Sequence, residues 1–475
     1  MLYRAFYNIV ATLTPLLTTP YVARTLGADG VGKFSYTLSI ASYFALAAML
    51  GITTYGCKEI AKCAEDKDKR SKCFFEIYNI QIVLSITSFA AYFLYVTFFE
   101  GKYLTLFLIQ GVRIAACVFD VNWVLFGLEE FETTVKRDFL IKLLTIFSIF
   151  IFVKGRDALI IYTLIMCITT LLSAVIVLPF VAKRVSFVRT RREDVLRRMF
   201  PVFLYFVPTI SSSLFHEVDV TILGKYNMLS EAGCYHNADR IINIPKGIII
   251  GLGTVFLSRA TRLINEDPLK NRNLYIKMNE VYTFLVSPIA IGIASISEDF
   301  VPLFLGAGYE RSTGLIYWLS IVLVIRTYNN HLLTGYYLPY EKERSYTFIA
   351  LITTVLNILL DIIVIKNHGA VGAVWVTILC EGIVLLYLIL NADKKITRLG
   401  RGEKMSVLIY FVFGLIMYFV IVLLKQFLAC DGMLKVLLEI AVGFVVYAVL
   451  CILYWRINPS SAVGNELNKI RRKKK

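Results

Sequence analysis

The sequence predicts an all-α polytopic membrane protein with about fourteen transmembrane helices. Hydrophobic residues make up 57% of the 475 residues and charged residues only 18%, which leaves too little polar surface for a water-soluble domain of this length. Apolar runs long enough to cross a bilayer, about 20 residues each, recur along the whole chain. Lys and Arg gather in alternate connections between these runs, as the positive-inside rule requires.

The predicted spans fall into a first set of six and a second set of eight. The first set lies at 4–23, 34–56, 74–99, 103–127, 138–153 and 158–182. The second set lies at 201–223, 236–258, 278–297, 314–333, 346–366, 370–391, 405–428 and 434–455. The fifth run is short, so we expect its helix to begin before Lys142.

The distribution of basic residues predicts the topology. With the N-terminus inside, the connections on the cytoplasmic side hold most of the 50 Lys and Arg residues, so both termini are expected to lie on the cytoplasmic side of the cell membrane. Basic inner loops facing an anionic leaflet explain the net charge of +16 without a nucleic-acid partner. The basic tail at Arg471–Lys475 is expected to be solvated and to contact lipid.

The first two spans are joined by a short glycine-rich polar turn, from Arg24 to Lys33. The first span carries Pro15 and Pro20, and proline inside a membrane helix is tolerated only where protein or a watery cavity satisfies the freed backbone groups. This helix is therefore expected to line a cavity rather than to face lipid.

An internal repeat predicts two lobes. The first repeated pattern is Leu26-Gly27 followed by Gly32-Lys-Phe34, which recurs as Leu223-Gly224 followed by Gly233-Cys-Tyr235. The second is Phe139-Leu-Ile-Lys-Leu-Leu-Thr, which is similar to Phe348-Ile-Ala-Leu-Ile-Thr-Thr. Six helices separate the copies, so both copies have the same orientation. Such repeats imply a pseudo-twofold axis along the membrane normal, with a central cavity between two six-helix lobes.

Four regions follow from the spans and the repeat. The N-lobe is expected at 1–182, a cytoplasmic amphipathic linker at 183–200, the C-lobe at 201–392, and two further helices with the basic tail at 393–475. In the linker, Val188, Val195, Leu196 and Met199 can share one side with arginines opposite, which is typical of an interfacial helix.

Several segments resemble one family of transporters. They are Pro15–Gly30, Tyr55–Lys62, Phe119–Phe131, Glu231–Pro245, Phe300–Gly306 and Gly369–Val374. Together they are similar to the polysaccharide transporter family, the Wzx-like flippases of the multidrug/oligosaccharidyl-lipid/polysaccharide (MOP) exporter superfamily. The resemblance implies a MATE-like fold and a lipid-linked oligosaccharide as the transported substrate. Lys58 departs from the family pattern, where arginine is expected, and keeps the charge but not the bidentate fork. Val220-Thr221 and Tyr337 also depart from the pattern, and these two departures bear on the substrate rather than on the family.

Three cations lie near the middle of predicted spans, where an unpaired charge costs several kcal/mol. They are Arg113, Lys246 and Arg326. Arginine offers a planar fork that matches phosphate oxygens and lysine a point charge, so these residues, with Arg24 at the first outer turn, are the candidates for binding a diphosphate headgroup. Internal ion pairs, such as Arg113 with Asp120 or Lys246 with Asp239, are the alternative.

Further polar residues are candidates for the cavity wall or for binding a coupling ion. They are Asp120, Glu217, Asp219, Asp239, Asn243, Asp361 and Glu381. Asp239, Asn243 and Lys246 are spaced by four and three residues, which places them on one helical face. For His216 and His331 we favour a packing role over proton relay.

Catalytic and metal-binding patterns are lacking. The nine cysteines include no CxxC pair, and Cys57, Cys63 and Cys73 fit no zinc spacing. The sequence has no Walker motif and no outer connection long enough to form a soluble catalytic domain. We therefore expect a transporter without cofactor or metal, and not an enzyme.

The resemblance to this family implies the function. We expect the chain to transfer a polyprenyl-diphosphate-linked oligosaccharide from the inner to the outer leaflet for surface polysaccharide synthesis. Its expected partners are this glycolipid, membrane lipids, and polysaccharide polymerase or export proteins. A multidrug exporter of the same superfamily is one alternative, although its cavity would need acidic rather than basic groups. A membrane-embedded glycan polymerase or ligase is the other, and it would usually need a large outer loop.

Overall fold

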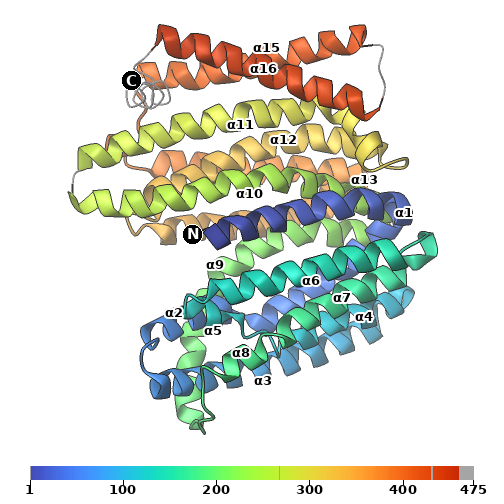
Figure 1. Cartoon of the computed structure of the whole chain (residues 1–475), viewed down its shortest axis with the longest axis vertical. Coiled ribbons are helices and arrows are strands. Elements are labelled where there is room, and N and C mark those ends of the chain that lie inside the picture. The colour runs from blue at the N-terminus through green and yellow to red at the C-terminus, as the bar shows by residue number, and fades with distance from the viewer. Residues whose placement is uncertain (1, 267, 429–431, 459–475) are drawn as a thin grey trace. The chain divides into compact units, whose positions relative to one another are not determined.

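The computed structural model describes residues 2–266, 268–428 and 432–458, and every regular element in these ranges is a helix (Figure 1). The chain divides into two compact units, residues 1–233 and 234–475. The basic tail at Arg471–Lys475 lies outside the described residues.

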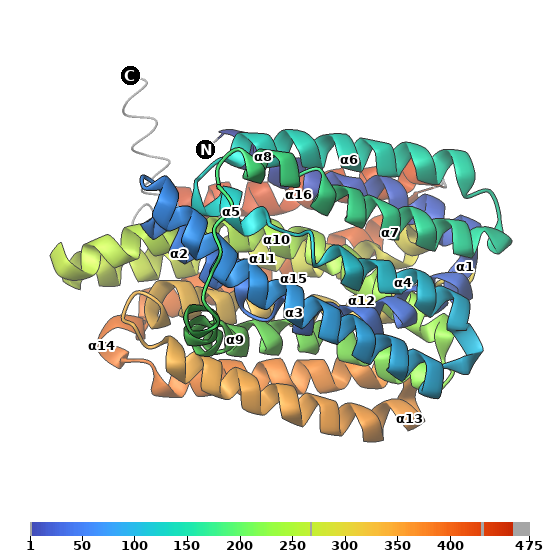
Figure 2. The same ribbon diagram turned by 90° about the horizontal axis from the view of Figure 1, so that it is seen from below.

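The first unit contains helices α1 to α9. In it, α1 packs against α3, α4, α6 and α9, while α4 packs against α7 and α2 against α5 (Figure 2). The helices are α1 (Leu2–Met49), α2 (Ile52–Lys62), α3 (Lys67–Phe99), α4 (Leu104–Ala116), α5 (Asn122–Gly127), α6 (Phe131–Phe152), α7 (Leu159–Val175), α8 (Leu178–Ala182) and α9 (Arg192–Lys225).

The second unit contains α11 to α16 and most of α10, whose first turn belongs to the first unit. Helix α11 packs against α12, α15 and α16, and α12 packs against α13. The elements are α10 (Leu229–Glu266), α11 (Pro268–Phe304), α12 (Glu310–Leu332), a π-helical turn η3 (Leu333–Tyr337), α13 (Glu343–Asn391), α14 (Lys394–Thr397), α15 (Arg401–Phe427) and α16 (Met433–Ile457).

The predicted apolar runs are helical over most of their length, although the run at 103–127 is divided between α4 and α5 and the run at 158–182 between α7 and α8. Helix α6 begins at Phe131, which confirms that the fifth helix starts before Lys142. In two places, two consecutive predicted spans are joined without a loop. The two helices meet at a kink formed by a glycine with positive φ, which is Gly27 in α1 and Gly369 in α13. Among the described residues eight helical segments are long and apolar enough to cross a membrane, so the fold is polytopic, and the count of fourteen crossings stays a prediction.

The linker differs from the prediction. Residues 183–191 are not helical, and α9 begins only at Arg192 and continues into the seventh predicted span. Side chains of α3 hold this segment instead: Arg70 donates to the carbonyl of Arg184, and the Ser186 amide donates to Ser71 Oγ at 2.9 Å. The helix expected across the first half of the linker is therefore wrong, because its backbone groups are satisfied by a neighbouring helix.

The glycine-rich turn of α1 packs closely on the start of α10, within the first unit. A Cβ atom on Gly32 would lie 1.8 Å from the carbonyl oxygen of Leu229, and one on Gly233 would lie 2.1 Å from that of Ala28. Only glycine permits this backbone-to-backbone approach. The two sequence copies of the Leu-Gly…Gly pattern thus meet in the folded chain.

The internal repeat also appears in backbone geometry. Glu129, after α5, and Glu341, after η3, both have positive φ, at 58° and 55°, although glycine is the usual residue at such a helix end. At both turns the next residue donates its amide to the carbonyl five positions earlier: Glu130 to Leu125 at 2.9 Å, and Lys342 to Tyr337 at 2.7 Å. The two units therefore end corresponding helices with the same capping motif.

The last two helices are tied to α11 by ion pairs. Asp299 Oδ2 lies 2.7 Å from Lys425 Nζ on α15, and its Oδ1 lies 2.8 Å from Lys435 Nζ on α16. The packed side chains of Tyr410, Met417 and Tyr447 also form an apolar core between α11, α15 and α16.

Candidate functional site

A half-buried polar cluster joins three helices of the second unit. Asp239, Asn243 and Lys246 come from α10, Arg326 from α12 and Glu381 from α13. All five were candidates from the sequence, where they lie in three separate predicted spans. The fold brings them together because α12 packs against α13 and their contacts extend to α10.

Arg326 is the centre of this cluster. Its guanidinium Nε donates to Glu381 Oε1 at 2.7 Å, and its Nη1 lies 3.8 Å from Asp239 Oδ1. The arginine side chain is only 9% exposed, so the two carboxylates supply the countercharge that a buried cation needs. Asn329, one turn further along α12, donates to Glu381 Oε2 at 2.8 Å and fixes the carboxylate from its other side.

The face predicted for α10 is confirmed by its hydrogen bonds. Asn243 Nδ2 donates to Asp239 Oδ2 at 2.6 Å, and Asn243 Oδ1 accepts from Lys246 Nζ at 3.1 Å. The amide of Asn243 therefore connects the lysine with the aspartate.

The cluster is charge-balanced but not saturated with hydrogen bonds. It holds two cations and two carboxylates, so its formal charge is zero. Among the described residues, Arg326 Nη1 and Asn329 Oδ1 are buried without a hydrogen-bond partner, and buried polar groups of this kind are uncommon in proteins. Both groups retain capacity to bind an additional ligand.

Arg113 and Asp120 do not pair with each other. Asp120 Oδ1 accepts hydrogen bonds from the backbone and side-chain amides of Asn122, at 3.3 and 2.6 Å, in the break between α4 and α5. Asn122 in turn accepts from Arg137 Nη1 at 2.7 Å. Asp120 therefore shapes a turn, and the ion pair considered for it is wrong.

The other candidates are dispersed. Arg24 is exposed on α1, Glu217 is half-buried on α9, and Asp219 is buried on the same helix. Asp361 is buried on α13 of the second unit, on the other side of the Gly369 kink from Glu381. Arg24 and Arg113 belong to the first unit and Lys246 and Arg326 to the second, so a clamp made of all four cations stays a prediction.

A second arginine cluster was not anticipated. In the first unit, Arg198 of α9 donates from Nε to Glu76 Oε2 at 2.5 Å, and from Nη1 to Glu59 Oε2 at 2.9 Å and Tyr55 OH at 3.0 Å. These contacts fasten α9 to α2 and α3. Burial lowers the pKa of the Arg198 guanidinium, but the hydrogen bonds to Glu76, Glu59 and Tyr55 together outweigh burial and raise this pKa, so the side chain stays charged at every physiological pH.

Two of the family-like segments pack on each other beside this cluster. Gly56 of the Tyr55–Lys62 segment lies against the indole of Trp123, which belongs to the Phe119–Phe131 segment, and a Cβ atom there would lie 2.5 Å from the ring. The indole Nε1 donates to Gln81 Oε1 at 3.0 Å. These segments therefore build the fold at this end of the first unit.

No metal centre is present within the described residues, where no group of three or more His, Cys, Asp or Glu side chains could hold an ion. The eight described cysteines are free thiols.

Comparison with known proteins finds two family models and two named relatives that are similar to this chain. Residues 1–262 match the family model of the polysaccharide biosynthesis protein, and residues 138–443 match that of the lipid II flippase MurJ. A protein of Escherichia coli (strain K12) whose name describes an O-antigen transporter is 22% identical over 353 residues, which are 73% of this chain and 85% of that protein. A similarly named protein of Shigella dysenteriae is 18% identical over 79% of this chain and 95% of its own length.

Solved structures show the same fold. A structure of the lipid II flippase MurJ in an inward closed conformation aligns with a TM-score of 0.75, at 17% identity, over 96% of this chain and 98% of that one. The MATE multidrug transporter DinF-BH aligns with a TM-score of 0.53, at 16% identity, over 84% of this chain and 94% of that one. Because the first family model spans more than half of the residues, the chain belongs to the polysaccharide biosynthesis protein family, the Wzx-like flippases of the MOP superfamily.

Proposed function

We propose that this flippase moves a polyprenyl-diphosphate-linked oligosaccharide repeat unit from the inner to the outer leaflet, for the synthesis of a surface polysaccharide of the O-antigen, capsule or teichoic-acid type. The observation that carries the proposal is the half-buried Arg326 cluster, in which the buried Nη1 of the guanidinium has no hydrogen-bond partner among the described residues. The headgroup of such a lipid is polar and anionic, and its unassisted crossing would meet the full cost of burying charge in hydrocarbon.

The proposed role of the cluster is an exchange of partners. In the structure Glu381 and Asp239 neutralise Arg326, so the cations are not left uncompensated when no substrate is bound. A diphosphate offers several oxygens that can accept from a guanidinium fork and from Lys246 Nζ at the same time. Binding would then release the carboxylates, and this change of partners supplies a difference between the loaded and empty states.

The membrane potential favours this direction of transport. With the inside negative, outward movement of one negative charge is favoured by about 2.3 kcal/mol per 100 mV. Arg24, Arg113, Glu217, Asp219 and Asp361 remain candidates for further substrate or coupling-ion contacts.

The proposed location is the cytoplasmic membrane, with both termini inside. Cysteines introduced at Lys102 and Lys366 should react with impermeant reagents from outside intact cells, and one at Lys67 should react only after the membrane is opened. Labelling of position 67 in intact cells would contradict this topology. Polysaccharide polymerase or export proteins are the proposed protein partners.

The function is tested by headgroup translocation in proteoliposomes with a fluorescent polyprenyl-diphosphate oligosaccharide. The wild-type chain should expose the glycan to an impermeant quencher on the far side. Arg326→Lys should retain part of the rate, since the charge remains but the bidentate fork is lost, and Lys246→Ala should be impaired.

The same proteoliposomes distinguish the proposed flippase from a multidrug exporter. A cationic dye loaded inside them should not be transported. Transport of the dye without movement of the glycolipid would identify a multidrug exporter and would overturn the proposal.

A further inference from the structure

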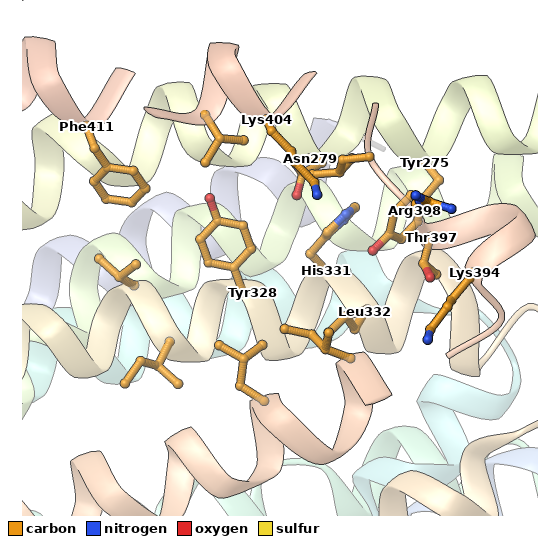
Figure 3. Close-up of a pocket in the computed structure, with 16 residues that line it drawn as sticks. Tyr275, Asn279, Tyr328, His331, Leu332, Lys394, Thr397, Arg398, Lys404 and Phe411 are labelled. Carbon is orange, nitrogen blue, oxygen red and sulfur yellow. The ribbon is translucent and has the colours of Figure 1, made fainter. Parts of the chain in front are cut away.

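A second candidate site lies in the second unit, in a cavity of about 840 Å³ between α11, α12, α13, α14 and α15 (Figure 3). Its volume is within the roughly 300–1,000 Å³ of small-molecule sites. Most of its wall is aliphatic and aromatic, and nothing in the proposed transport cycle uses it.

The cavity has one basic end and one apolar end. Lys394, Thr397 and Arg398 gather at one end in Figure 3, and Phe411 lies at the other. Lys404 reaches toward the same space from α15. Among the described residues, none of the three basic side chains forms an ion pair, so their charges are available to an anion.

His331 lies between the two ends. It is 1% exposed, lines the cavity, and stacks on Tyr275 with ring centroids 4.4 Å apart. Neither ring nitrogen has a hydrogen-bond partner within the described part of the chain. A buried imidazole without partners is costly, and in its neutral form it offers one donor and one acceptor to a ligand.

This cavity is distinct from the Arg326 cluster. His331 follows Arg326 by five positions on α12, which places it about 140° around the helix at 3.6 residues per turn. Tyr328, which also lines the cavity, points away from Arg326 for the same reason. The two sites therefore use opposite faces of α12.

We propose that this cavity binds an acidic glycerophospholipid of the inner leaflet. Its phosphate would accept hydrogen bonds from Lys394, Arg398 and Lys404, His331 would donate to an ester carbonyl, and an acyl chain would occupy the apolar end toward Phe411. The connection from α13 to α15 that carries Lys394 and Arg398 is predicted to be cytoplasmic, which places the basic end at headgroup depth. The aliphatic and aromatic side chains that make up most of the wall suit an acyl chain.

The test is lipid retention by the purified full-length chain, measured by native mass spectrometry. The protein is equilibrated with phosphatidylglycerol or with phosphatidylcholine of identical acyl chains. The wild type should retain phosphatidylglycerol preferentially. Lys394→Gln/Arg398→Gln/Lys404→Gln should lower that retention on the order of tenfold, because charge-assisted bonds to phosphate are lost.

A matched control removes the same charge from outside the cavity. Arg344→Gln/Lys395→Gln/Arg401→Gln changes three exposed side chains that do not line it and should retain phosphatidylglycerol like the wild type. The three basic residues of the cavity are exposed as well, so both triple variants should melt at the same temperature.

A histidine variant tests the ester contact separately. His331→Phe keeps a ring against Tyr275 but removes the N–H donor, so retention of both lipids should fall together. Equal retention of phosphatidylglycerol by both triple variants would overturn the proposal. Displacement of the retained lipid by an equimolar polyprenyl diphosphate would overturn it too, because the cavity would then belong to the transported substrate.

Discussion

Arg198 and Arg326 are each held by two carboxylates, but their surroundings differ. Arg198 donates to three oxygens from α2 and α3, with no hydrogen-bond capacity of its Nη1 or Nε left unused. Arg326 makes one short bond to Glu381 and a longer contact to Asp239, and its Nη1 has no hydrogen-bond partner among the described residues. The first arrangement is that of a structural fastener, and the second leaves a donor for a ligand.

The space around a glycine next to each arginine cluster also differs. Near Arg198, a Cβ atom on Gly56 would overlap the Trp123 ring at 2.5 Å. Next to Lys246 in the Arg326 cluster, a Cβ atom on Gly247 would meet no described atom within 4 Å. Close packing converts any added volume at Gly56 into lost stability, whereas a side chain added at the exposed Gly247 meets no described neighbour.

The largest expected effect is the loss of stability when Arg198 is removed. Arg198→Ala leaves Glu76, which is 4% exposed, without its main countercharge, and breaking a buried pair in this way costs about 3–5 kcal/mol. The thermal midpoint of the purified protein should fall strongly. Arg197→Ala, one exposed position earlier, is the control and should melt like the wild type; equal midpoints for both variants would remove the distinction between the two clusters.

A steric change sharpens the comparison without altering any charge. Gly56→Val should destabilise the first unit by about 1–3 kcal/mol, the usual cost of overpacking. Gly247→Val should stay close to wild-type stability, because its side chain points into open space. Denaturation of both variants in the same detergent checks this, and a larger loss for Gly247→Val would refute the contrast.

The smallest expected effect concerns Asp120. Asp120→Ala removes the two hydrogen bonds from Asn122 and should cost about 1 kcal/mol. Because Asp120 does not pair with Arg113, the effects of Asp120→Ala and Arg113→Ala on unfolding should add within about 0.5 kcal/mol. A coupling energy well above this value would show that Asp120 and Arg113 interact, and would contradict the structural assignment.

Much of the fold follows from sequence periodicity and turn residues. Apolar runs predicted the helices, and the glycine-rich turn that contains Gly27 predicted the junction of the first two spans. Gly369, which has positive φ like Gly27, was not predicted to join two spans. The linker at 183–191 was misjudged because its composition suits a helix, whereas hydrogen bonds from Arg70 and Ser71 hold it in another conformation. Local patterns do not contain such long-range contacts.

The sites were predictable to different degrees. Lys246, Arg326 and Glu381 stood out because charges at the middle of a span are costly. Asn329 was missed, although its position three residues after Arg326 places it on the same helical face. The Arg198 cluster could not be found from the sequence. Glu59 and Arg198 lie in predicted cytoplasmic connections and Glu76 at the inner end of a predicted span, where charged residues are ordinary, and only the tertiary fold joins them.

The most direct measurement compares two charge-neutral double variants in the glycolipid translocation assay. Neutralising both members of an ion pair leaves neither charge without the other, unlike the removal of one partner, so both proteins are expected to fold. Arg198→Gln/Glu76→Gln should translocate at close to the wild-type rate, because its pair serves the fold. Arg326→Gln/Glu381→Gln should be slower by roughly tenfold or more, since a charge-assisted contact to the diphosphate is lost. Wild-type translocation by the Arg326→Gln/Glu381→Gln protein would contradict the account, because the Arg326 cluster would then be only a second fastener.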